Sequence, residues 1–168
     1  YVPENYYHDK SINSYTLKTA PIFMPNGVGG YMPSEIEEPG YARFGKPGTI
    51  NSLFWALHHG YVVVSPAIRG RSQKNEAGKF TGKAPACLVD YKAAVRYLHA
   101  NAHLVPGDTN KIITNGTSAG GALSSLMATT IDHPDFEPFL EEIEAFNSTD
   151  KIFAASCYCP ITNLEHAD

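Results

Sequence analysis

The 168-residue chain is 43% hydrophobic and 18% charged, a composition typical of one globular domain with a sizeable core. Its formal net charge is −4 and its 13 basic residues are scattered, so we expect no nucleic-acid partner. No apolar run approaches the ~20 residues that span a bilayer, and no basic and then hydrophobic signal segment opens the chain. We therefore also expect no membrane partner.

The three cysteines, an odd number, do not make a disulfide framework. A zinc site would need more ligands than the Cys157-x-Cys159 pair and the distant Cys87 supply, so we expect no metal. We expect all three to be buried small side chains. Cysteine usage leaves the compartment open between the cytoplasm and secretion.

The first part of the chain predicts extended segments followed by a glycine-rich loop. Residues 1–14 have no clear period and suit an edge strand or a connection, whereas residues 15–18 and 21–24 read as extended. Prolines bound the second extended segment, and proline lacks the N–H group that a central ladder requires. In the loop at residues 25–31, glycines would let backbone N–H groups approach a substrate closely; a plain surface turn is the alternative.

Residues 49–65 predict a helix and then a buried strand. Thr49 is the expected N-cap and Gly60 the stop of a helix whose apolar residues recur at helical spacing: Ile50, Leu53, Phe54 and Leu57. The strand at residues 61–65 is apolar without alternation, as a strand covered on both faces requires. Arg69 follows in a loop, where it either pairs with a buried carboxylate, the reading we favour, or touches substrate.

Two further helices and a last strand are expected. The first runs over residues 86–102, with one apolar face. The second begins at Asp135 and carries an acidic, solvated face beside an apolar stripe made of Phe136, Phe139, Leu140, Ile143 and Phe146. Residues 151–158 read as the last strand. The alternation of strands with amphipathic helices predicts an α/β fold, with a mostly parallel sheet and helices on both faces.

The central motif is Gly-x-Ser-x-Gly at residues 116–120, between a β-branched strand at residues 111–115 and a helical pattern. A turn this sharp strains the backbone of Ser118 and leaves little space but for hydrogen at Gly116 and Gly120. It would expose the Ser118 hydroxyl as a nucleophile at the carboxyl edge of the sheet. The N–H of Ala119 and one from Gly29 or Gly30 would then bind an oxyanion. A glycine and serine loop entering an ordinary helix is the alternative.

These features, taken in order, resemble the α/β-hydrolase superfamily. Residues 25–33, 115–126 and 159–168 more specifically resemble the bacterial tannases, serine esterases related to feruloyl esterases. The resemblance covers nearly the whole chain but only the N-terminal part of such an enzyme, so we expect residues 1–168 to be that part of an α/β-hydrolase domain. In the family the triad runs Ser, Asp, His, and only Ser118 maps here; the resemblance places the other two beyond residue 168.

The resemblance implies hydrolysis of galloyl-type aromatic esters through an acyl-enzyme, without a cofactor. Pocket candidates are Asn26, Thr117, His166 and Asp168, and His133 or His166 is a local alternative for the base. A general carboxylesterase or peptidase of the same fold is one alternative function. A non-catalytic scaffold chain is another, and in either case we expect the C-terminal remainder of the same protein to be a partner.

Overall fold

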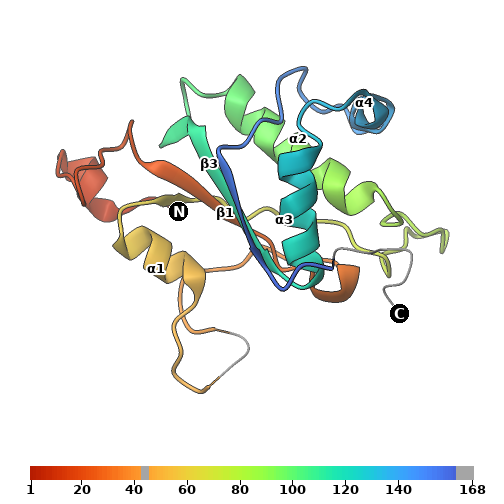
Figure 1. Cartoon of the computed structure of the whole chain (residues 1–168), viewed down its shortest axis with the longest axis horizontal. Helices are drawn as coiled ribbons and strands as arrows, with labels where there is room; N and C mark the ends of the chain where they lie inside the picture. Colours follow the sequence, from red (N-terminus) through yellow and green to blue (C-terminus); the bar gives the residue numbers. More distant parts are fainter. Residues whose placement is uncertain (43–45, 162–168) are drawn as a thin grey trace.

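A parallel sheet with helices on both sides forms the centre of the computed structural model, which describes residues 1–42 and 46–161 (Figure 1). Strands and helices alternate along most of the chain, and β3, with 10 residues, is longer than the other three described strands. In chain order the elements, with η marking 3-10 helices, are η1 (Glu4–His8), β1 (Pro21–Pro25), η2 (Gly29–Tyr31), α1 (Ser52–His58), β2 (Val62–Val63), α2 (Ala86–Ala100), β3 (Asp108–Thr117), α3 (Ala119–Thr129), η3 (Pro134–Phe136), α4 (Glu137–Glu142) and β4 (Ala154–Tyr158).

The four strands are all parallel and lie in the order β2-β1-β3-β4. Ile22 pairs with Val62 on one side and with Ile112 on the other, so β1 is an interior strand. Its two prolines stand at its first and last positions, where a strand tolerates a missing N–H group. The expected parallel sheet is confirmed.

Each face of the sheet has its own apolar core. Helices α2 and α3 cover one face, where Tyr91 and Leu123 pack with Ile22 and Ile112. Helix α1 covers part of the other face, with Leu53 against Val63. Figure 1 shows α1 on the opposite side of the strands from α2 and α3. Burying one such aliphatic side chain contributes about 1.5–3 kcal/mol, so the two cores together fix the sheet between its helices.

The helix before β2 begins later than its apolar spacing predicts. Asn51, not Thr49, caps α1: its side-chain oxygen accepts from the N–H of Phe54 at 3.0 Å. Ile50 pairs with Tyr41 in an isolated bridge instead of joining the helix. Gly60, at φ 87°, follows the helix as expected.

The predicted helix after Asp135 is much shorter than its sequence pattern. A 3-10 turn precedes α4, which ends at Glu142, and Leu140 is the buried member of the expected stripe. Phe139 and Phe146 are exposed, 41% and 49%. The acidic face is also not wholly solvated, because Glu137 pairs with Arg96.

Buried charges join α2 to the segments around α4. The side chains of Lys92 and Asp150 are fully buried, and Lys92 Nζ lies 2.9 Å from Asp150 Oδ1. Arg96 donates to the other carboxylate oxygen of Asp150 and to Glu137. Lys92 also donates to the carbonyl of Thr130 at the C-terminal end of α3. This charge cluster, defined as Lys92, Arg96, Glu137 and Asp150, ties the end of α3 to α2.

The N-terminal residues are connected to the sheet. The N–H of Val63 donates to the carbonyl of Tyr1, and the amino group of Tyr1 donates to the carbonyl of Val63. Within the described part of the chain, no helix combines the length and apolar character that crossing a bilayer requires.

Candidate active site

The strand order brings two loops to one place. After β1 the chain moves to β2 on one side, and then to β3 on the other side of β1. In an open parallel sheet, such a reversal opens a crevice at the carboxyl ends of the two strands concerned. The loop after β1 carries the glycines at residues 27–30, and the turn after β3 carries Ser118. The two segments that sequence analysis singles out therefore meet at this switch point.

Ser118 occupies a strained turn between β3 and α3. Its φ of 59° and ψ of −119° lie outside the regions that non-glycine residues usually occupy. Its N–H donates to the carbonyl of Tyr158 in β4 at 2.9 Å, and its carbonyl accepts from Ala122 at 3.0 Å. These bonds hold the backbone in place while the residue stays exposed.

The glycines around Ser118 are required by close packing. A Cβ on Gly116 would collide with the carbonyl of Gly120 and lie 2.8 Å from Asn26 Nδ2. A Cβ on Gly120 would collide with Asn26 Oδ1, and one on Gly121 would lie 2.6 Å from the carbonyl oxygen of Tyr158. The expected space for hydrogen alone at Gly116 and Gly120 is confirmed.

Two backbone N–H groups remain available near Ser118. Ala119 is the first residue of α3, and among the described residues its N–H has no acceptor. In the glycine-rich loop, the N–H of Gly29 already donates to Gly27 at 2.8 Å, whereas that of Gly30 has no acceptor in the described part of the chain. Of the two expected donors in this loop, Gly30 is therefore the one whose N–H has no acceptor among the described residues.

The glycine-rich loop has open space around Gly29 and Gly30 and packs against the core through Val28. A Cβ on Gly29 or on Gly30 would meet no atom within 4 Å. Val28 is buried in the core, and η2 packs against α3. The loop thus presents its glycine backbone to open space beside the helix that Ser118 begins.

Asn26 connects this loop to the Ser118 turn. Its side-chain Nδ2 lies 3.0 Å from the carbonyl oxygen of Asn115, 3.1 Å from that of Gly120 and 3.0 Å from Ser124 Oγ. Its own N–H donates to Asn115 at 2.9 Å. Asn26, expected as a pocket residue, lies beneath the turn and holds its two sides.

A family profile described as BD-FAE matches residues 45–167. This is well over half of the chain and includes β2, β3, β4 and the Ser118 turn. The chain belongs to the BD-FAE family. Among curated proteins, the probable carboxylic ester hydrolase LipM of Mycobacterium tuberculosis is 40% identical over 60 residues, which is 36% of this chain and 14% of LipM.

Solved tannase structures are similar over the whole of this BD-FAE chain. The tannase of Fusobacterium nucleatum is 54% identical with a TM-score of 0.94, covering 100% of this chain and 34% of the tannase. A tannin acyl hydrolase solved in complex with ethyl gallate is 49% identical with a TM-score of 0.89, covering 99% of this chain and 36% of that protein. The tannase of Lactobacillus plantarum is 49% identical with a TM-score of 0.91, covering 99% of this chain and 35% of that protein. The resemblance to bacterial tannases and the α/β-hydrolase fold are confirmed, and the chain spans about a third of these relatives.

The remaining expected site residues of this BD-FAE chain divide into three cases. Thr117, the last residue of β3, is exposed at the same edge as Ser118. His133 follows the C-terminal end of α3, an 11-residue helix about 16 Å long, and is therefore too far from Ser118 to act as its base. His166 and Asp168 lie outside the described residues.

Arg69 has a structural partner. Its backbone N–H and its guanidinium both donate to Asp90, with Nη2 2.6 Å from Oδ1. The hydrogen bond that the guanidinium donates to Asp90 raises the pKa of Arg69 above its ordinary value, although burial opposes this. The preferred prediction of a pair with a carboxylate is confirmed, but Asp90 is only partly buried rather than buried.

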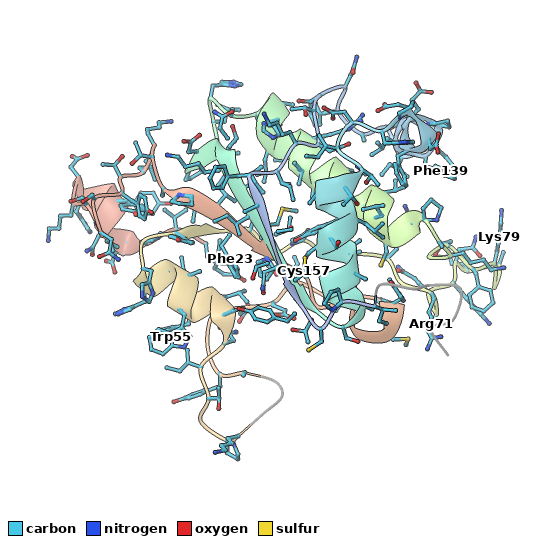
Figure 2. The ribbon with its side chains drawn as sticks, in the orientation of Figure 1. Phe23, Trp55, Arg71, Lys79, Phe139 and Cys157 are labelled. Atoms are coloured by element: carbon cyan, nitrogen blue, oxygen red, sulfur yellow. The ribbon has the colours of Figure 1, made fainter. Side chains whose placement is uncertain are left out.

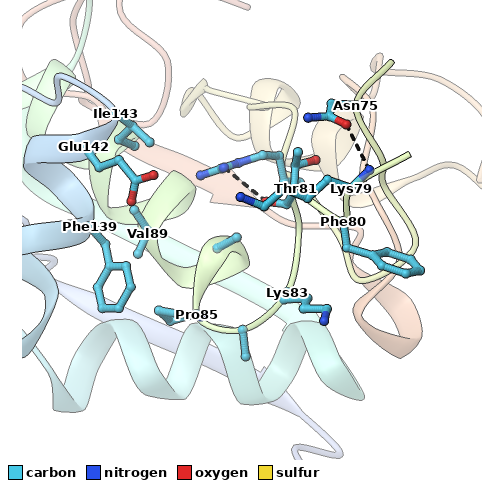
Figure 3. A pocket seen from close by; sticks show the side chains of 13 residues that line it. Asn75, Lys79, Phe80, Thr81, Lys83, Pro85, Val89, Phe139, Glu142 and Ile143 are labelled. Atoms are coloured by element: carbon cyan, nitrogen blue, oxygen red, sulfur yellow. Dashed lines mark hydrogen bonds between the residues drawn. The ribbon is translucent and has the colours of Figure 1, made fainter. Parts of the chain in front are cut away.

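A hollow of about 280 Å³ lies beside Arg69, between α4 and the loop before α2 (Figure 3). Phe139 and Glu142 stand on one wall, and Lys79 and Phe80 on the other. Figure 2 shows Arg71 and Lys79 gathered on this side of the molecule, away from Trp55 on α1. None of the described residues expected in the active site lines it.

The expectation that all three cysteines are buried is confirmed only for Cys87. Cys87 is buried, Cys157 is partly buried and Cys159 is exposed, because β4 ends at Tyr158 and Cys159 turns away at φ 44°. Burial, with a smaller effect of Asp90, raises the pKa of Cys87 to about 11, and burial also raises the pKa of Cys157. Neither thiol is therefore a thiolate nucleophile near neutral pH.

Two contacts that hold the Ser118 turn and the glycine-rich loop in place could not be predicted from the sequence. The carbonyl of Tyr158 anchors Ser118, and the hydroxyl of the buried Tyr91 donates to the carbonyl of Met24, just before the glycine-rich loop. Contacts to backbone carbonyls cannot be predicted from residue types. The role of Asn26 at the site is indicated by its position in the sequence, directly after a strand and before Gly27.

Proposed function

We propose that this chain carries the nucleophile and the oxyanion hole of a serine ester hydrolase, and that its substrates are galloyl-type aromatic esters. The supporting observation is the strained, exposed Ser118 between β3 and α3, beside two N–H groups without acceptors among the described residues. Strain of this kind, about 1–3 kcal/mol, persists where the surroundings enforce it and is concentrated at functional sites.

The reaction proceeds through an acyl-enzyme. Ser118 Oγ attacks the ester carbonyl while a histidine accepts its proton, and the carbonyl oxygen becomes an oxyanion. The N–H groups of Ala119 and Gly30 bind this oxyanion, each contributing about 3 kcal/mol to transition-state stabilisation. The C–O bond breaks, the histidine returns its proton to the leaving alcohol, and water then releases the acid and restores Ser118.

The galloyl preference is supported by the tannases at about half identity, one of them solved with ethyl gallate. LipM, a probable carboxylic ester hydrolase, supports a general carboxylesterase as the second candidate. Methyl gallate, methyl ferulate, p-nitrophenyl butyrate and a chromogenic dipeptide discriminate between them. We expect the highest kcat/KM on methyl gallate; preference for the butyrate or the peptide overturns the galloyl assignment.

The acid and the base come from chain beyond residue 168. The chain spans 34–36% of the tannases, and β4 is the edge strand of the described sheet, so one side of its backbone is open for pairing. We expect residues 1–168 alone to be inactive and the complete protein to be active. Methyl gallate hydrolysis by residues 1–168 alone would overturn this and make His166 the first base to test.

The decisive experiment uses a fluorophosphonate probe on the complete protein, followed by mass mapping of the labelled peptide. The probe reacts with a serine only where a base and an oxyanion hole activate it. We expect label on Ser118. Label elsewhere would overturn Ser118 as the nucleophile, and no label would favour a non-catalytic scaffold.

A further inference from the structure

Asn26 holds both sides of the Ser118 turn with one side chain. Its Nδ2 group contacts the carbonyl of Asn115, three residues before Ser118, and the carbonyl of Gly120, two residues after it. Its backbone N–H donates to Asn115 as well, which completes the last pair of β1 with β3, Pro25 with Asn115. The backbone N–H and the side-chain Nδ2 of Asn26 thus both donate to Asn115, at the end of β3. Nδ2 also donates to Gly120, at the start of α3.

The fit around this side chain leaves no free space. A Cβ on Gly116 or Gly120 would meet an atom of the Asn26 amide. Asn26 Oδ1 is buried and has no hydrogen-bond partner among the described residues. Leaving a buried polar atom unpaired costs about 1–3 kcal/mol, so the orientation is maintained by the bonds that Nδ2 makes.

Asn26 is also the first residue after β1, and the loop that follows it leads to Gly30. The two proposed oxyanion donors, Gly30 and Ala119, belong to different segments of the chain. The distance between them depends on what joins the segments, and the Asn26 side chain makes that connection directly beneath Ser118.

We propose that Asn26 is a positioning residue, which holds the loop of Gly30 at the correct separation from Ser118 and Ala119. This inference rests on the proposed function, because it concerns the geometry of that site. Catalysis needs each donor nitrogen at hydrogen-bond distance, about 2.7–3.1 Å, from the oxyanion, and a misplacement of about 1 Å costs about 100-fold in rate.

The test compares Asn26→Asp and Asn26→Ala in the complete protein. Aspartate has the same shape but turns the donor into an oxygen that faces two carbonyl oxygens, and alanine removes the donor. Fluorophosphonate titration counts the competent sites, and kcat is then expressed per titrated Ser118. We expect kcat per site on methyl gallate to fall about 100-fold in both variants, with KM within about threefold of the wild type.

A merely structural role gives another result. It lowers the titrated fraction and the melting temperature, but leaves kcat per titrated site unchanged. If the alanine variant does not fold, the isosteric aspartate variant carries the test. The matched control is Asn101→Asp, which alters a similar bond from a side-chain amide to the carbonyl of Tyr97 at the end of α2. We expect this control to keep wild-type kcat.

Two results would overturn the inference, and they are distinguishable. If the wild type labels at Ser118 but both Asn26 variants keep kcat per site within about twofold, only the positioning role is wrong. If the wild type does not label at all, the proposed function is wrong and the positioning role with it.

Discussion

The N–H of Ser118 donates to the carbonyl of Tyr158 at 2.9 Å, across the pairing of β3 with β4. The amide of Ser118, the proposed nucleophile, is thus engaged on the sheet side and is not available to an oxyanion. The next amide, that of Ala119, opens α3 and receives the favourable potential of the helix N-terminus. This relationship explains why the strained turn is stable: the next strand along the chain holds it.

Two replacements of Ser118 distinguish the backbone strain at this residue from the catalytic role of its hydroxyl. Ser118→Ala removes the nucleophile and should lower kcat by at least about 1,000-fold. Ser118→Gly should do the same but also relieve the positive φ, so we expect it to be about 1 kcal/mol more stable than the alanine variant. Ester assays and urea unfolding measure the two effects. Equal unfolding free energies of the alanine and glycine variants would contradict the proposed strain at Ser118. Retained activity in either variant would contradict its role as the nucleophile.

Gly116→Ala and Gly120→Ala should damage the turn by collision. Each new Cβ would meet a carbonyl or the Asn26 amide, so the backbone must shift, at about 1–3 kcal/mol of unfolding free energy and with loss of fluorophosphonate labelling. Gly40→Ala is the matched control, because nothing lies within 4 Å of its Cβ position. We expect it to stay within about 0.5 kcal/mol of the wild type. Normal labelling in the two turn variants would show that the turn is adaptable.

The sequence predicted the parallel sheet and the Ser118 turn because both depend on local signals. β-branched runs, helical spacing and the glycines at 116 and 120 are enough to predict strand, turn and helix. Boundaries were less accurate. Asn51 outcompetes Thr49 as a cap because its side chain reaches the N–H of Phe54, a contact that spacing alone does not reveal.

Contacts between residues that are far apart along the chain could not be predicted from the sequence. Lys92 and Asp150 are 58 positions apart, and nothing in their neighbourhoods indicates that they pair. The bonds of Asn26 reach residues 89 to 98 positions away. His166 and Asp168 lie outside the described residues, so their place in the pocket stays a prediction.

Acid should weaken the contact between α2 and α4. The hydrogen bond from Arg96 holds the pKa of Glu137 below its ordinary value. A carboxyl group whose pKa is lower in the folded state stabilises that state above the unfolded pKa of about 4.3, and this stabilisation is lost as the pH falls through the folded pKa. Urea unfolding between about pH 5 and pH 3 should therefore show a smaller loss of stability in Glu137→Gln than in the wild type.

The control for this titration is Glu141→Gln on the same helix, an exposed residue with no ion pair among the described residues. It should follow the wild-type pH dependence. If Glu137→Gln also follows it, the contact with Arg96 does not contribute to acid sensitivity.

The buried pair of Lys92 and Asp150 should be a large stability determinant without being part of the site. Lys92→Met keeps the length of the side chain but leaves Asp150 with less compensation, and breaking a buried pair costs about 3–5 kcal/mol. Because Arg96 still donates to Asp150, we expect the lower value, about 3 kcal/mol.

The pair of Lys92 and Asp150 lies at the C-terminal end of α3, opposite Ser118, so kcat per titrated Ser118 should not change. Lys111→Met, which breaks a partly exposed pair with Asp108, should cost less than about 1 kcal/mol. Urea unfolding of the two variants measures the loss of unfolding free energy in each. Equal losses would mean that the buried pair stabilises the fold no more than the pair of Lys111 and Asp108.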